Sequence, residues 1–168
     1  NVLGSSGSVI PLFIKQIKSK QKITITNSNM TRFSLTMSEA LDFILHATKI
    51  GKGSEIFIPK LRSYSIADVK NILTQILKNT GEKEIGIRPG EKLHEILCPE
   101  DSSRDTLEFK DYYLIRPTFY HVDSTKSQNN SYKINKNNEK GKFVKSNFVY
   151  NSNTNSHFLS VKELKKLI

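Results

Sequence analysis

The residues best suited to chemistry lie in one charged segment, G-I-R-P-G-E-K-L-H-E, at positions 86–95. It places Arg88 at the end of an expected strand, a Pro-Gly turn next, and Glu91 three residues after the arginine. A planar guanidinium can make two parallel hydrogen bonds to a diphosphate, and a carboxylate can accept hydrogen bonds from ribose or sugar hydroxyls. The residues alone leave two interpretations open, an anion site or an Arg–Glu ion pair that stabilises the turn.

Two further segments could contribute to an anion site. Arg32 lies between apolar residues in M-T-R-F at 30–33, where an arginine either pairs with an acid or points into a cleft. The Gly/Ser segment 4–8 precedes a predicted helix, and free backbone N–H groups at such a position can bind an anion. An ordinary loop is the alternative for that segment.

Other reactive residues do not form recognisable sites. His94-Glu95 lacks the second histidine of H-E-x-x-H, so no zinc site is expected. Cys98 is the one cysteine, which excludes an internal disulfide and suits a reducing compartment, and we interpret it as structural. We therefore predict no metal site and no catalytic residue in this chain.

The elements that position these residues follow from hydrophobic spacing and capping signals. Helices are predicted at 9–17, 36–50, 65–77 and 160–168, with a further helical turn at 93–97. Strands are predicted at 23–26, 30–35, 55–58, 84–87 and 112–115. Alternating strands and helices indicate an α/β fold. No G-x-G-x-x-G segment follows an early strand, so no dinucleotide-binding motif is expected here.

Composition separates the chain into three parts. Residues 1–117 resemble a globular α/β domain, 118–157 form a polar region rich in Asn, Lys and Ser, and 158–168 form a C-terminal helix. The 168 residues carry a net charge of +10, which favours anionic partners. The basic residues are scattered, so nucleic acid is not the expected partner. No apolar run is long enough to span a membrane, and a cytoplasmic location is expected.

Four blocks of sequence together resemble a known family. They are N-V-x-G-S-x-G-S-V-I-P-x-F from residue 1, I-T-I-T-x-x-x-M-T-R-F from residue 23, E-I-F-I-P-K from residue 55, and the segment 86–95. In order and spacing they are similar to the C-terminal part of the CapD-like polysaccharide-biosynthesis dehydratases, a branch of the extended short-chain dehydrogenase/reductase (SDR) superfamily. The later residues resemble the inverting UDP-N-acetylglucosamine 4,6-dehydratases.

The resemblance implies a binding site for a UDP-sugar, with UDP-N-acetylglucosamine as the expected substrate. It implies that Asn1 binds the phosphates or the sugar, and that Thr24 gives backbone contacts to the uracil. Arg32 and Arg88 would clamp the diphosphate, and Glu91 would hold the ribose hydroxyls. Ser6 occupies a position where family members usually carry arginine, which removes one cation from the expected site.

The resemblance further implies that the Rossmann-type part is largely missing. NADP would bind to a Gly-rich loop in an N-terminal half, which also carries the Tyr-x-x-x-Lys and Asp-Lys pairs that perform the elimination and invert C5. We therefore predict a substrate-binding portion that is inactive alone and requires that half, with a homo-oligomer as a further possibility. A non-catalytic UDP-sugar-binding module and a basic nucleic-acid-binding protein are the alternatives. Convergence of Arg32 and Arg88 is the structural test.

Overall fold

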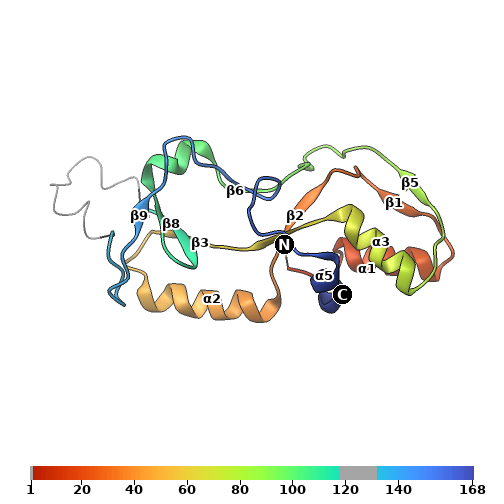
Figure 1. Ribbon diagram of the computed structural model, residues 1–168, viewed down its shortest axis with the longest axis horizontal. Helices are drawn as coiled ribbons and strands as arrows, with labels where there is room; N and C mark the ends of the chain where they lie inside the picture. The colour runs from red at the N-terminus through yellow and green to blue at the C-terminus, as the bar shows by residue number, and fades with distance from the viewer. Residues whose placement is uncertain (1, 118–131) are drawn as a thin grey trace. The chain divides into compact units, whose positions relative to one another are not determined.

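The computed structural model describes residues 2–117 and 132–168 and contains helices and strands in alternation, which confirms the predicted α/β class (Figure 1). The chain forms two compact units. Unit 1 contains Asn1–Met37, Leu61–Glu95 and Asn151–Ile168, and unit 2 contains Ser38–Lys60 and Ile96–Tyr150. The units interleave along the chain because packing brings distant segments together. The boundaries drawn from composition after residues 117 and 157 stay a prediction.

Three helices of unit 1 pack their apolar faces into one core. They are α1 (Val9–Lys18), α3 (Ile66–Ile76) and α5 (Val161–Leu167). The residues that α1 and α3 bury recur at helical spacing, so each of these two helices places a single stripe in the core, and α5 adds Leu164. The buried residues of α1 and α3 are Ile10, Phe13, Ile17, Ile66, Val69, Ile72 and Leu73. The end of α3 lies outside this core, since Ile76 and Leu77 are 49% and 44% exposed.

Helix capping in unit 1 agrees with the sequence at two of three serines. The Ser65 hydroxyl accepts a hydrogen bond from the Ala67 amide, and Ser160 forms a complete capping box with Glu163. Ser8 has the extended backbone of an N-cap, but its side chain makes no capping bond. The start of α1 therefore depends on packing of its apolar face more than on a cap.

Two pairs of strands complete unit 1. Strand β1 (Ile23–Ile25) runs parallel to β5 (Glu82–Glu84), and β2 (Thr31–Ser34) runs antiparallel to β4 (Arg62–Ser65). The sequence predicted a strand at 84–87, and the structure forms it earlier because Ile23 and Ile25 pair with Glu82 and Glu84. Strand β4 was not predicted.

Unit 2 is built on a four-stranded antiparallel sheet. Its order is β3 (Ile56–Pro59), β8 (Tyr112–Ile115), β7 (Thr106–Glu108) and β9 (Lys142–Phe143). The remaining elements that include unit 2 residues are α2 (Met37–Ile50), β6 (Ile96–Cys98), the 3₁₀ helix η1 (Glu100–Asp105) and β10 (Tyr150–Asn151). Tyr112 lies in the core, with its ring stacked on Phe109 at 4.7 Å between centroids.

One predicted element needs correction, and helix α2 exposes an apolar face. The helical turn expected at 93–97 is absent, because Ile96–Cys98 forms strand β6 instead. The apolar face of α2 is largely uncovered, with Leu41, Ile44 and Leu45 between 55% and 60% exposed. Within residues 2–117 and 132–168, no helix has the length and apolar character needed to cross a membrane.

Candidate functional site

Arg32 lies at the centre of a charged cluster in unit 1. Its Nη1 donates hydrogen bonds to the Thr31 carbonyl at 2.7 Å and to the Leu93 carbonyl at 3.1 Å. Its Nε lies 3.6 Å from a carboxylate oxygen of Glu95, and its side chain is 14% exposed. Much of the donor capacity of this guanidinium is therefore used by the protein itself.

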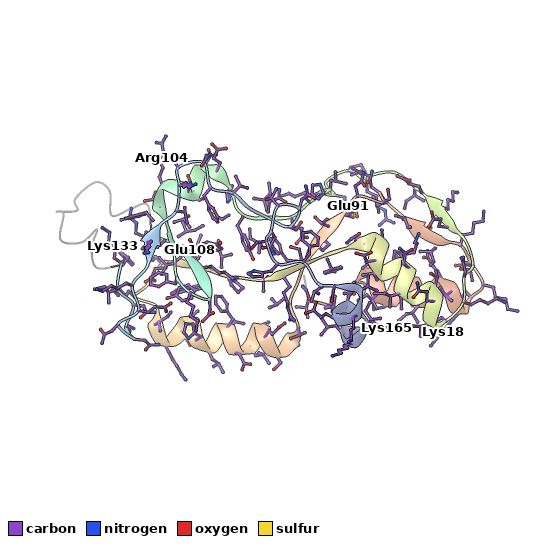
Figure 2. The ribbon with its side chains drawn as sticks, in the orientation of Figure 1. Lys18, Glu91, Arg104, Glu108, Lys133 and Lys165 are labelled. Atoms are coloured by element: carbon purple, nitrogen blue, oxygen red, sulfur yellow. The ribbon has the colours of Figure 1, made fainter. Side chains whose placement is uncertain are left out.

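Glu91 is the carboxylate that joins the predicted site residues, and Figure 2 shows it in the segment that links β5 to β6. One oxygen lies 4.0 Å from Nη2 of Arg32 and accepts a long hydrogen bond of 3.5 Å from Thr26 Oγ1. The other accepts one of 3.4 Å from the Arg88 amide. All three distances are at the long end of the polar contact range. The carboxylate therefore keeps lone pairs for a further donor.

Arg88 differs from Arg32 in its surroundings. The residue is exposed, and its guanidinium has no ion-pair partner among the residues that the structure describes. Its backbone amide donates to one oxygen of Glu91, and the other oxygen lies near the Arg32 guanidinium, so the Arg88 backbone and the Arg32 side chain share one carboxylate. The exposed guanidinium of Arg88 can contact a ligand, whereas the Arg32 guanidinium already lies beside Glu91 and Glu95.

Tyr64 lies beneath this cluster. It is the register partner of Arg32 across β2 and β4 and is 4% exposed. Burial raises the pKa of Tyr64 to about 12, while the charge of Arg32 lowers it and that of Glu95 raises it. The phenol therefore stays protonated and neutral at physiological pH, and it does not act as a base.

The other predicted site residues lie elsewhere or outside the described chain. Thr24 lies on β1, where its amide donates to Gln16 Oε1 at 3.1 Å and its hydroxyl accepts from Gln16 Nε2 at 2.8 Å. The Thr24 amide, a backbone group expected to contact uracil, is therefore already hydrogen-bonded to the Gln16 side chain. Ser6 is exposed. Asn1 lies outside the described residues. Direct roles of Asn1, Thr24, Arg32, Arg88 and Glu91 in ligand binding stay predictions.

The Gly/Ser segment before α1 bonds much of its own backbone. The Ser5 amide donates to the Val2 carbonyl, the Ser8 amide donates to the Ser5 carbonyl, and the Leu3 amide donates to Leu35. These bonds favour an ordered loop, because they use N–H groups that an anion would otherwise contact. Gly4 and Gly7 permit the tight path with positive φ angles of 74° and 76°.

Sequence reasoning missed several polar residues near the cluster. Thr31, Ser152 and the Nδ1 of His94 form a hydrogen-bonded chain in unit 1. Thr31 and Ser152 are separated by 121 residues, so no local pattern connects them. Glu95 belongs to the motif 86–95, and its acidic side chain in that motif is the signal that could have pointed to an ion pair with Arg32.

No redox or metal site emerges from the remaining reactive groups. Cys98 is fully buried in unit 2, and burial raises the pKa of its thiol, partly offset by a contact with Thr106. A thiol in this state is a poor nucleophile. Within the described ranges 2–117 and 132–168, no group of three or more His, Cys, Asp or Glu side chains could hold a metal ion.

The fold and the sequence relatives define the class of protein. The chain has the α/β fold of the C-terminal part of an extended SDR enzyme. It resembles the X-ray structure of Pen from Bacillus thuringiensis with a TM-score of 0.77 and 34% identity, covering 100% of this chain and 46% of that one. The family described as "Polysaccharide biosynthesis protein" matches residues 1–117. The chain belongs to this family.

Curated relatives agree with this assignment. The chain is 43% identical over 169 residues to the UDP-N-acetylglucosamine 4,6-dehydratase (inverting) of Campylobacter jejuni subsp. jejuni serotype O:2, covering 100% of this chain and 48% of that protein. It is also 38% identical over 116 residues to the UDP-glucose 4-epimerase of Rickettsia rickettsii, covering 68% of this chain and 34% of that protein. The chain thus spans about half the length, or less, of these curated relatives.

Proposed function

We propose that this chain is the sugar-nucleotide-binding part of a UDP-N-acetylglucosamine 4,6-dehydratase of the inverting type, a lyase that acts in surface polysaccharide or pseudaminic acid biosynthesis. The observation that carries the proposal is the match along the whole chain, at 43% identity, to a protein of that name. The lone buried thiol fits a reducing compartment, and the proposal places the protein in the cytoplasm.

The charged cluster of unit 1 is proposed to bind the UDP moiety. Arg88 supplies an exposed guanidinium for the diphosphate, and Arg32 supplies a second positive charge beside Glu91. Among the described residues, the Glu91 carboxylate makes only long contacts, so it can accept shorter hydrogen bonds from ribose hydroxyls without losing a strong partner. Glu91 and Glu95 partly neutralise the charge of Arg32 and so weaken its attraction for a diphosphate. Arg88 is therefore the principal phosphate ligand in this proposal.

The family relationship implies NADP, but residues 2–117 and 132–168 do not form a Gly-rich dinucleotide site. A dinucleotide fold requires a Gly-rich turn between a strand and a helix. Here Gly4 and Gly7 precede α1, but they do not have the G-x-G-x-x-G spacing of such a turn. We therefore assign NADP binding and the chemical steps to a further polypeptide segment, and we expect this chain alone to be inactive.

The exposed face of α2 supports the need for such a segment. Leu41, Ile44 and Leu45 form an apolar stripe on one side of the helix. Stripes of this kind usually mark an interaction surface. The relatives are about twice as long as this chain, so the part of them that it does not match is the proposed partner of the stripe, with a second copy as the alternative.

Calorimetric titration of UDP into the 168-residue chain tests the proposal. Arg88→Ala is expected to weaken UDP binding by roughly 1.5–3 kcal/mol, or at least tenfold, because it removes a charge-assisted hydrogen bond. Arg104→Ala is the matched control, since it removes an exposed arginine in unit 2 (Figure 2). It is expected to leave the UDP affinity unchanged.

Each alternative function predicts a different result. A non-catalytic UDP-sugar-binding module would show the same UDP binding, but mixing it with the N-terminal half of a homologous dehydratase would restore no 4-keto sugar. Binding of duplex DNA that weakens steeply with salt, together with no response to UDP, would support a nucleic-acid-binding protein instead.

A further inference from the structure

Two buried hydroxyl groups join three segments of unit 1. Thr31 Oγ1 on β2 lies 2.7 Å from Ser152 Oγ and 2.8 Å from His94 Nδ1. Ser152 is 0% exposed and Thr31 is 6% exposed. Buried hydroxyls at these distances are firmly hydrogen-bonded, because no water competes for them.

The backbone strengthens the same connection. The Ser152 amide donates to the Glu95 carbonyl at 2.8 Å, and the Glu95 amide donates to Ser152 Oγ at 2.9 Å. On the other side, the Thr31 amide donates to the Leu93 carbonyl at 3.2 Å. Segment 93–95 is therefore held between strand β2 and Ser152.

The protons in this chain of groups can be assigned consistently. Where His94 Nδ1 carries no hydrogen, the Thr31 hydroxyl donates to it and the Ser152 hydroxyl donates to Thr31 Oγ1. Where Nδ1 carries the hydrogen, the direction reverses, and Ser152 donates to the Thr31 carbonyl at 3.3 Å. Ser152 Oγ accepts from the Glu95 amide in both cases, so removing this oxygen leaves that N–H without its partner.

We propose that Ser152, acting through Thr31 and His94, is a positioning residue for the binding turn 88–91. The inference rests on the proposed function. The turn lies in an exposed stretch, and the Glu91 carboxylate has only long contacts of its own, so the anchor at 93–95 limits its motion. Ser152 lies beyond residue 117, where the family match ends. The C-terminal segment of the chain thereby contributes to a site whose ligand-binding residues all lie in the first 117 residues.

Hydrogen exchange and UDP titration of the full chain test this role. Ser152→Ala is expected to speed exchange of the Glu95 and Glu91 amides at least tenfold more than exchange of the α3 amides, and to lower the Tm because the Glu95 N–H loses its buried partner. UDP binding should weaken about tenfold, which corresponds to about 1.4 kcal/mol. Ser156→Ala, the same substitution at an exposed serine of the same segment, should change neither. Ser152→Thr keeps the hydroxyl and should restore both measurements towards wild type.

The outcomes separate the two proposals. Unchanged exchange across 88–95 in Ser152→Ala would overturn the positioning role whatever UDP does, and so would faster exchange with unaltered UDP affinity. A wild-type chain that binds no UDP would refute the proposed function by itself. If Ser152→Ala fails to fold, His94→Ala at a partly exposed position tests the same chain of bonds, and it should reproduce the faster exchange at Glu91.

Discussion

The Nη1 atom of Arg32 lies 3.1 Å from the backbone carbonyl of Leu93. This bond ties strand β2 to the segment that carries Arg88 and Glu91. The same Nη1 also bonds the Thr31 carbonyl, so one side chain holds two stretches of backbone. Arg32 therefore has a structural role in unit 1 besides the proposed charge on a ligand.

Replacing Arg32 with lysine separates these two roles. Arg32→Lys keeps a positive charge beside Glu91 and Glu95 but loses the rigid guanidinium, whose Nη1 bonds both carbonyls while its Nε faces Glu95. The free energy of unfolding is expected to fall by about 1–3 kcal/mol in urea denaturation. Arg88→Lys, at an exposed position, should change it by less than about 0.5 kcal/mol. Equal effects of the two substitutions would contradict the structural role of Arg32.

The raised pKa of Tyr64 predicts that the folded protein loses stability at alkaline pH. Its pKa is about 12 in the folded protein, above the ordinary value of 10.0, because burial disfavours the phenolate. The stabilisation is fully present below pH 10 and is lost as the pH rises from 10 through 12. Two pKa units correspond to about 2.7 kcal/mol as an upper bound.

Urea denaturation of Tyr64→Phe at pH 8.5, 10 and 11 provides the measurement. The variant should lose less stability between pH 10 and 11 than the wild type, and Tyr113 should account for part of the remaining slope because its pKa is also raised to about 12. Identical pH dependence in both proteins would show that Tyr64 does not contribute.

The serines before two helices should differ in their effect on stability. Ser65→Ala removes the hydroxyl that accepts from the Ala67 amide at 3.1 Å, and it is expected to cost about 1 kcal/mol. The buried Ser8 hydroxyl has no hydrogen-bond partner among the described residues, so Ser8→Ala should be neutral or slightly stabilising. Thermal unfolding followed by circular dichroism compares the two. A larger loss for Ser8→Ala would contradict the capping geometry.

Gly141 should tolerate no side chain. A Cβ atom there would lie 2.6 Å and 2.7 Å from two ring carbons of Phe109, which is stacked on Tyr112 in the core of unit 2. Gly141→Ala is expected to destabilise the protein by about 1–3 kcal/mol, because the rings must move. Near-ultraviolet circular dichroism would report the changed ring packing. The neighbouring exposed Lys142→Ala should leave the spectrum unchanged.

Local signals in the sequence were sufficient for several elements. The buried positions of α1 recur at helical spacing, and Ser65 and Ser160 mark the helix starts that the structure shows. These features depend on residues within about four positions of one another, so the sequence states them directly. The order of the four motif blocks likewise identified the family without any coordinates.

Other features depended on pairing between distant segments. Ile96–Cys98 became a strand although Leu93, Ile96 and Leu97 have helical spacing, and β4 formed opposite β2 without a sequence signal. A short apolar run fits either structure, and its tertiary partners decide between them.

The amino-acid sequence by itself established the α/β class, the family and the positions of Arg32, Arg88 and Glu91 along the chain. Tertiary packing alone determined that Arg32 is shared with Glu91 and Glu95, that Arg88 stays exposed, and that Ser152 reaches Thr31 across 121 residues. The physical reason is that charge pairing and burial depend on distances in space. The spacing of residues along the chain does not specify those distances.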